Sequence, residues 1–276
     1  MVLARGLGTR MQKQVPGLRL DRHTDRLAAE GVKGLIRVGR PFMDHMLQAL
    51  MDAGVRELCL IVRPGASVIR RYYQAVGRML THARIAFAVQ AEPLGTANAV
   101  AAGEDWAGDR PFMVFNSDNY YYPRTVAALA AAPAPASVAY EREGLVARSN
   151  IPADRIARFA VMDIDSGGLL RGIVEKPRNP DAFARGGKLY VSMNCFLLTR
   201  EIFAACGAIE PDPVRKEYEL PTAVQYTIDR LGLKYRAVPS AEGVLDLTGR
   251  ADIEPVRRML AGHVVRFPAP TGPEVD

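Results

Sequence analysis

Short apolar segments alternate with longer amphipathic segments through the first half of the chain. The apolar segments read VRELCLIV (55–62), ARIAFAVQ (83–90) and FMVFNSD (112–118), and turn residues follow each of them. The stretches between and before them carry apolar residues at helical spacing, at 41–54, 67–80 and 95–106. This β-α-β-α-β series predicts an α/β fold with a mainly parallel sheet flanked by helices, and ligands beyond the carboxyl ends of the strands.

The second half of the chain is richer in strand-like segments. We expect strands at 137–140, 158–164, 169–177, 189–199 and 234–239, and helices at 199–206, 217–231 and 250–262. No internal repeat is visible. We therefore predict a single domain over residues 1–266, followed by a disordered tail, FPAPTGPEVD (267–276).

The net charge of +6 is concentrated at the N-terminal end of the chain. Residues 1–40 hold nine Lys or Arg and three Asp or Glu, whereas residues 41–276 hold 27 of each kind. A local excess of positive charge indicates a phosphate-bearing partner. Nucleic acid is not expected, because no basic segment carries interleaved aromatic residues for stacking on bases.

The cysteines and the hydropathy pattern give expectations about the compartment. Three cysteines, none in a CxxC pair, are typical of free thiols and argue against a disulfide framework or a zinc site. No apolar run approaches the ~18 residues of a membrane-spanning helix, and the start MVLARGLGTR lacks the apolar core of a signal peptide. We expect a cytoplasmic protein with no membrane partner.

A glycine-rich loop, LARGLGTRM (3–11), follows the first short apolar segment. Its backbone N–H groups can form an anion-binding nest, and Arg10 can add a charge-assisted contact to phosphate. The loop lacks the Lys-Ser/Thr of a P-loop and the third glycine of the dinucleotide fingerprint. A plain strand-to-helix turn is the alternative interpretation.

Four further motifs carry candidate chemistry. In QAEPLGTANA (90–99) the Gln90 amide could read a base edge, although Thr96 could instead cap a helix. In FNSDN (115–119), Asp118 ends a buried strand, where a magnesium ligand or an ordinary turn would both be typical. EKP (175–177) and LDLT (245–248), with Asp252 beyond it, are weak signals alone.

Taken together and in this order, the five motifs resemble those of the sugar-1-phosphate nucleotidylyltransferases, in particular the glucose-1-phosphate thymidylyl- and uridylyltransferases. The segment KGLIRVGRPFMDHMLQALMDAGV (33–55) strengthens the resemblance. It implies a Rossmann-like, GT-A-like fold with a strand-rich sugar-binding half. It also implies an enzyme of nucleotide sugar biosynthesis, which transfers a nucleotidyl group from dTTP or UTP to a sugar 1-phosphate, with glucose 1-phosphate expected, and releases pyrophosphate with Mg²⁺ as cofactor.

The resemblance also implies roles for individual residues. Those assigned to the nucleotide are Leu3, Ala4, Gly6, Gly8, Thr9, Gln90, Gly95 and Thr96. Those assigned to catalysis are Arg10, Lys33, Asp118 and Lys176. Asp118 and Asp246 would hold the metal, and Glu175, Asn194 and Asn119 would contact the sugar. No nucleophilic side chain is required, because the sugar-phosphate oxygen is already anionic near neutral pH.

Several alternatives stay open from the sequence. A non-catalytic, sugar-nucleotide-binding regulatory relative would share the fold, but retention of the charged residues argues against it. The sequence does not choose between dTTP and UTP, and it leaves the sugar, a homo-oligomeric state and allosteric regulation undetermined. Asn194 stands where many members of the family have glycine, and the insertion at 13–32 leaves the geometry of Arg10 and Lys33 open.

Overall fold

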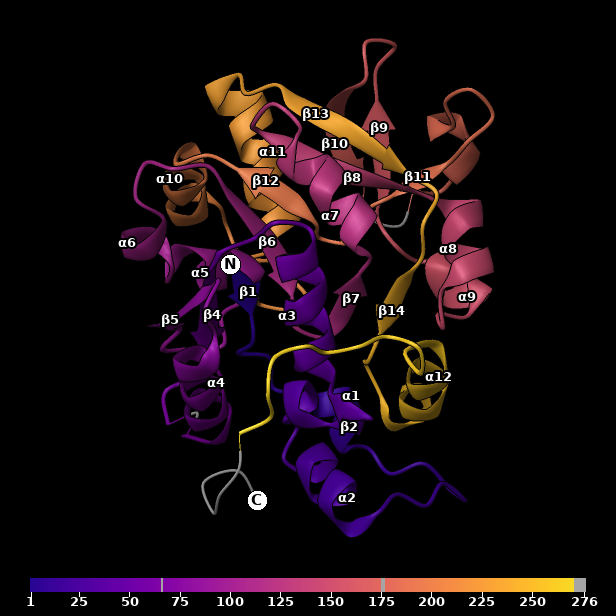
Figure 1. Cartoon of the computed structure of the whole chain (residues 1–276). Helices are drawn as coiled ribbons and strands as arrows, with labels where there is room; N and C mark the ends of the chain where they lie inside the picture. The colour runs from indigo at the N-terminus through magenta and orange to yellow at the C-terminus, as the bar shows by residue number, and fades with distance from the viewer. Residues whose placement is uncertain (66, 175–176, 271–276) are drawn as a thin grey trace.

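A ten-stranded sheet with helices on both faces organises the molecule, of which the computed structural model describes residues 1–65, 67–174 and 177–270 (Figure 1). The strands are β1 (Val2–Leu3), β2 (Arg37–Val38), β3 (Arg40–Pro41), β4 (Glu57–Val62), β5 (Arg84–Val89), β6 (Phe112–Asn116), β7 (Asn119–Tyr121), β8 (Ala136–Glu141), β9 (Val161–Ile164), β10 (Leu169–Val174), β11 (Tyr190–Val191), β12 (Phe196–Leu198), β13 (Tyr235–Ser240) and β14 (Val244–Asp246). The order in the main sheet is β11-β9-β10-β13-β8-β12-β6-β1-β4-β5, while β14 pairs with β7 and β2 with β3 in two small sheets.

The helices connect these strands and cover the sheet. They are α1 (Thr9–Gln12), α2 (Arg22–Ala29), α3 (Phe42–Asp52), α4 (Ser67–Met79), α5 (Thr96–Ala101), α6 (Glu104–Ala107), α7 (Pro123–Ala130), α8 (Arg142–Arg148), α9 (Ala153–Ile156), α10 (Glu201–Ala208), α11 (Leu220–Leu231) and α12 (Ile253–Met259). Three 3₁₀ turns are η1 (Lys33–Leu35), η2 (Pro180–Phe183) and η3 (Arg250–Asp252).

Most strands of the main sheet run in one direction. β5, β4, β1 and β6 are parallel neighbours. Because β12 is antiparallel to both β6 and β8, β8 runs in the same direction as β6, and β13 is parallel to β8. In the second half, β8, β13, β10, β9 and β11 close into a ring of pairings. The predicted α/β class with a mainly parallel sheet is confirmed.

The sheet separates two apolar cores, one on each face. Along β4, Leu58, Leu60 and Val62 belong to one core, whereas Cys59 and Ile61 belong to the other. Successive side chains of a strand point to opposite faces, so a strand covered on both sides must be apolar throughout. This explains the continuous apolar run that marks β4 in the sequence.

Some predicted elements differ from the observed ones. The predicted strand 189–199 is divided into β11 and β12, because Asn194 adopts a left-handed conformation with φ of 51° between them. The predicted helix 95–106 is divided at Gly103 into α5 and α6. Helices α2, α8 and α9 and the β7–β14 pair were not expected from the sequence.

The C-terminal segment returns to the N-terminal half of the fold. Phe267, the first residue of the predicted tail, is buried, and its ring lies under the Arg40 guanidinium at 5.5 Å. Arg40 also donates to the Phe267 carbonyl oxygen at 3.4 Å. The tail prediction thus starts too early, and its last part, 271–276, lies outside the described residues.

No helix in the described part of the chain is long and apolar enough to cross a membrane.

Candidate functional site

A cavity of about 460 Å³ lies at the carboxyl ends of the neighbouring strands β1, β4, β5 and β6. This is the place at which a mainly parallel sheet is expected to bind ligands. The predicted nucleotide and catalytic residues that line it are Leu3, Ala4, Gly6, Gly8, Thr9, Arg10, Lys33, Gln90, Gly95, Thr96 and Asp118. One cavity therefore gathers side chains that are more than a hundred positions apart in the sequence.

The glycine-rich loop is held in place by a contact between two glycines. Gly8 has a φ of 64°, and a Cβ atom there would lie 2.5 Å from the carbonyl oxygen of Gly31. This approach packs the end of the 13–32 insertion against the loop, so Arg10 and Lys33 line the same cavity despite the insertion. At Gly6 a Cβ atom would meet no other atom within 4 Å, which leaves the backbone there open to a ligand.

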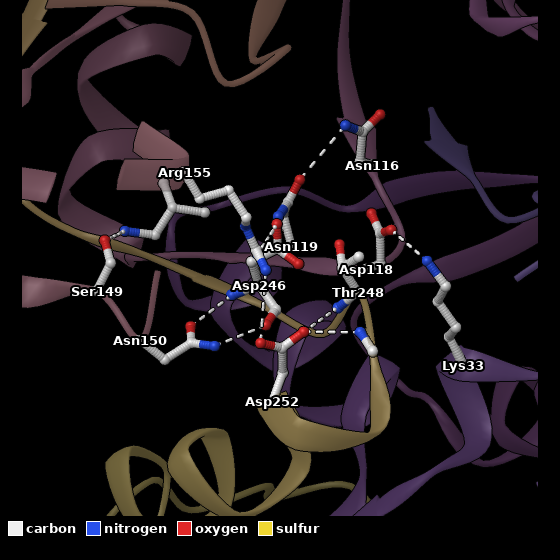
Figure 2. A network of polar contacts seen from close by, with 12 residues as sticks. Lys33, Asn116, Asp118, Asn119, Ser149, Asn150, Arg155, Asp246, Thr248 and Asp252 are labelled. Carbon is white, nitrogen blue, oxygen red and sulfur yellow. Dashed lines mark hydrogen bonds and ion pairs between the residues drawn. The ribbon is translucent and has the colours of Figure 1, made fainter. Parts of the chain in front are cut away.

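Lys33 and Asp118 form an ion pair at one end of the cavity. The Lys33 Nζ lies 2.9 Å from Oδ2 of Asp118, and both side chains are partly exposed. Lys33 opens the short turn η1, whereas Asp118 follows β6, so the pair joins two separate parts of the fold (Figure 2). The pair presents one positive and one negative group to any ligand in the cavity.

Asp246 lies beside this pair because β14 pairs with β7. In the antiparallel register Asp246 faces Asn119, the residue after Asp118. Its Oδ2 lies 2.8 Å from Nη2 of Arg155, and the Asn150 side chain holds the Asp246 backbone with two hydrogen bonds of 2.8 Å (Figure 2). Burial, and secondarily the charge of Asp118, raises the pKa of Asp246 to about 6.

The two carboxylates fit a magnesium ion. Oδ1 of Asp246 is buried and has no hydrogen-bond partner among the described residues, and such an oxygen is costly to bury unless a cation or a donor satisfies it. The described residues contain no group of three or more His, Cys, Asp or Glu that could hold a metal. Mg²⁺ commonly takes only one or two protein carboxylates together with substrate phosphates, so a pair of carboxylates is compatible with such a site.

Gln90 lies at the other end of the cavity with a fixed orientation. It is only 3% exposed, and its Nε2 donates to the Gly95 carbonyl oxygen at 3.0 Å and to Oδ1 of Asn98 at 2.9 Å. Because both N–H groups are used within the protein, Oε1 is the atom left to meet a ligand. The side chain is therefore a fixed hydrogen-bond acceptor.

Other predicted residues lie outside the cavity lining. Asn119 is buried, and its Oδ1 accepts from Nδ2 of Asn116 at 3.3 Å. Asn194 does not line the cavity either, and its left-handed backbone is a conformation that glycine and asparagine adopt more readily than other residues. The predicted sugar and catalytic residues Glu175 and Lys176 lie outside the described residues.

Two motif residues have roles in the fold that the sequence left undecided. The hydroxyl of Thr96 accepts from the backbone N–H of Leu220 at 2.8 Å, which ties α5 to α11, while Gly95 is the N-cap residue of α5. Asp252 accepts from the backbone N–H groups of Thr248 and Gly249 at 3.0 and 2.7 Å. Both residues thus stabilise the segments that carry the site.

Sequence reasoning missed three arginines of the site. Arg5 and Arg63 line the cavity, and Arg155 pairs with Asp246. Arg5 could have been noticed, since it stands inside the glycine-rich loop, where a long charged side chain is conspicuous. Arg63 and Arg155 belong to no motif, so only the fold reveals them.

The N-terminal positive charge is divided between two places. Arg5, Arg10 and Lys33 line the cavity. Arg22, Arg26 and Arg37 instead line a separate hollow, together with Arg257 of α12. Only part of the excess charge therefore faces the candidate site.

Comparisons with known proteins identify relatives of the whole chain. The family model for nucleotidyl transferases matches residues 27–247. A UTP–glucose-1-phosphate uridylyltransferase of Haloferax volcanii is 26% identical over 233 residues, which cover 83% of this chain and 82% of that protein. A glucose-1-phosphate thymidylyltransferase of Streptomyces antibioticus is 29% identical over 234 residues, covering 83% of this chain but only 57% of the longer relative.

A solved structure supports the fold independently. The crystal structure of a UDP-glucose pyrophosphorylase complexed with UDP-glucose superposes with a TM-score of 0.69. The match covers 95% of this chain and 97% of that one at 15% sequence identity. At this identity the likeness concerns the fold, and the site must be argued from its own residues.

Proposed function

The chain belongs to the nucleotidyl transferase family, and we propose that it transfers a nucleotidyl group from UTP or dTTP to a sugar 1-phosphate. The products are a nucleotide sugar and pyrophosphate. The similarity to uridylyl- and thymidylyltransferases that act on glucose 1-phosphate supports this reaction and makes glucose 1-phosphate the first sugar to test.

The observation that carries the proposal is the polarity of one cavity. Lys33 lies beside Asp118 where β6 ends, the fixed acceptor of Gln90 lies where β5 ends at the other side of the order β6-β1-β4-β5, and Arg10 adds a second cation to the lining. A nucleoside triphosphate has the same polarity, with an anionic chain at one end and a hydrogen-bonding base at the other. The cavity thus suits a nucleotide along its whole length.

The orientation of Gln90 supports a uracil or thymine base. Both bases carry an N3–H donor, which the free Oε1 of Gln90 can accept. Cytosine and unprotonated adenine present a ring-nitrogen acceptor at the corresponding edge, so they would place two acceptors face to face. Guanine has a donor at this edge and is therefore the competitor that an assay must include.

In the proposed reaction, the protein acts by orientation and charge neutralisation. The sugar-phosphate oxygen attacks the α-phosphorus in line with the leaving pyrophosphate, and no side chain need accept a proton. Arg10 neutralises the leaving phosphates, and Lys33 can turn from Asp118 toward a phosphate oxygen. Mg²⁺ held by Asp118 and Asp246 would supply further charge neutralisation.

Further parts of the proposal concern the setting of the reaction. Residues as distant as Leu3 and Thr248 line one cavity, which supports a single catalytic domain over 1–266. All three cysteines are free and buried, as is usual in a reducing compartment, and this supports a cytoplasmic location.

We also propose that Glu175, Asn194 and Asn119 contact the sugar and that Lys176 contacts its phosphate.

A panel assay tests the proposed function. The protein is incubated with Mg²⁺, one of UTP, dTTP, GTP, CTP or ATP, and one of several sugar 1-phosphates, and pyrophosphate release is measured. We expect release with UTP or dTTP and glucose 1-phosphate. Release with GTP alone would contradict the role of Gln90, and no release with any pair would favour the non-catalytic alternative.

A further inference from the structure

Arg5 is a charged residue in the cavity wall that the fold leaves without a partner. Its Nε and Nη1 atoms are buried and have no hydrogen-bond partner among the described residues. No ion pair joins it to a carboxylate in the described part of the chain, and the charge that acts on it is the positive charge of Arg63. Burial, and then this neighbouring charge, lowers the pKa of Arg5.

A guanidinium with two buried nitrogen atoms and no acceptors for them is unfavourable for the ligand-free protein, even though the side chain as a whole is half-buried. The N–H groups on these two atoms have lost water and gained nothing in exchange, and a second cation nearby adds to the cost. A bound ligand can supply the missing acceptors, so a side chain of this kind lowers the stability of the free protein and strengthens ligand binding. The structure therefore indicates a ligand acceptor close to Arg5.

The position of Arg5 in the sheet indicates which part of the ligand this is. Arg5 follows β1, and Arg63, whose positive charge acts on it, follows β4. In the sheet, β4 lies between β1 and β5, and Gln90 follows β5. Asp118 follows β6, on the opposite side of β1. The neighbouring charge of Arg63 and the strand order therefore favour the β4 side of β1 for the Arg5 side chain, which is the side on which Gln90 lies and the opposite side from Asp118.

We propose that Arg5 is a nucleotide-specificity residue whose unpartnered N–H groups donate to a carbonyl oxygen of the bound pyrimidine base. Gln90 accepts from the base N3–H, and Arg5 provides a donor for a neighbouring carbonyl, so the two side chains read complementary groups. This proposal rests on the proposed function, since it takes the ligand to be UTP or dTTP. It assigns Arg5 to the base and leaves the triphosphate to Arg10 and Lys33.

The variant Arg5→Met tests the proposal, because methionine keeps most of the stem but removes the charge and the N–H donors. We expect the KM for UTP or dTTP to rise about tenfold or more, as the loss of a charge-assisted hydrogen bond implies. The KM for the sugar 1-phosphate, and the KM for pyrophosphate in the reverse reaction, should stay unchanged. The melting temperature of the ligand-free variant should equal or exceed that of the wild type, because two buried N–H groups without acceptors have been removed.

Arg71→Met is the matched control, since Arg71 is an exposed arginine of α4 that does not line the cavity. It should leave all KM values unchanged. If Arg5→Met raises the KM for pyrophosphate together with that for the nucleotide, Arg5 contacts phosphate and the proposal is wrong. A lower melting temperature with unchanged KM values would identify a structural role and also overturn it.

A binding measurement separates this proposal from the proposed function. If the wild type releases no pyrophosphate with any substrate pair, the proposed function fails, and calorimetric titration with UMP and dTMP still tests Arg5. About tenfold weaker binding by Arg5→Met supports the role of Arg5 even then. Equal binding by both proteins, or no binding by either, contradicts it.

Discussion

At the scale of single residues, Gly6 and Gly8 have different reasons to be glycine. Gly8 combines a left-handed backbone with a close approach to the Gly31 carbonyl oxygen, so any side chain there would be strained and would collide with backbone. Gly6 has neither constraint, and a Cβ atom on it would point into open space. Gly8 is therefore required by the fold, whereas Gly6 lines the cavity without being required by the packing.

This difference predicts opposite effects of two alanine substitutions. Gly8→Ala should destabilise the protein by about 2 kcal/mol or more, because the left-handed backbone and the clash with Gly31 both disfavour it. Gly6→Ala should change the free energy of unfolding by less than ~0.5 kcal/mol but raise the KM for the nucleotide. Urea unfolding and steady-state kinetics measure the two effects, and equal stability of both variants would show that the glycine contact is unimportant.

The sequence predicted individual site residues only where motifs carried them. Gln90 and Asp118 were identified by their positions after strands, and both line the cavity. The pairing of Arg155 with Asp246 could not be predicted, because it joins α9 to β14, two elements that are about 90 positions apart in the sequence. The unpartnered state of Arg5 likewise follows from the surroundings of the side chain and not from its type.

At the scale of elements, the β7–β14 pair makes the candidate metal site. It brings Asp246 next to Asp118 from 128 positions further along the chain. Most predicted strands and helices recur with boundaries shifted by a few residues, since their apolar periodicity reflects burial on the sheet. The short β7 and β14 were not predicted, because three-residue strands carry too little periodicity to be recognised.

The contact between α3 and the C-terminal segment predicts a dependence of stability on pH. His45 of α3 is 3% exposed, its Nδ1 lies 3.1 Å from Nδ1 of His263, and burial lowers the pKa of His45 to about 4. Its pKa in the unfolded chain is near 6.5, so between these values the unfolded state binds more protons, and stability decreases as the pH falls. From pH 7 to pH 5 the loss attributable to His45 should be about 2 kcal/mol.

Two glutamine variants check this pH dependence. His45→Gln should remove most of that loss in urea unfolding at the two pH values. His82→Gln should retain it, because His82 is exposed. An equal loss of stability in the wild type and in His45→Gln would show that another group is responsible.

At the scale of the whole molecule, the direction of the sheet places the site. β5, β4, β1 and β6 lie side by side in the sheet (Figure 1). Because these strands are parallel, their carboxyl ends open into one cavity, and the residues that follow them line it. This arrangement could be predicted from the β-α-β-α-β pattern. The closed ring of β8, β13, β10, β9 and β11 could not, because antiparallel pairings between distant segments leave no local signal.

The most direct test of the account follows the α-phosphorus. The wild type and Asp118→Asn are incubated with Mg²⁺, glucose 1-phosphate, and UTP or dTTP labelled at the α-phosphate, and the labelled products are separated. We predict that the wild type transfers the label to a nucleotide sugar with one unlabelled pyrophosphate per transfer, and that Asp118→Asn does neither while retaining the wild-type circular dichroism spectrum. Transfer by Asp118→Asn at the wild-type rate, or label released by the wild type only as nucleoside monophosphate, would contradict nucleotidyl transfer at this site.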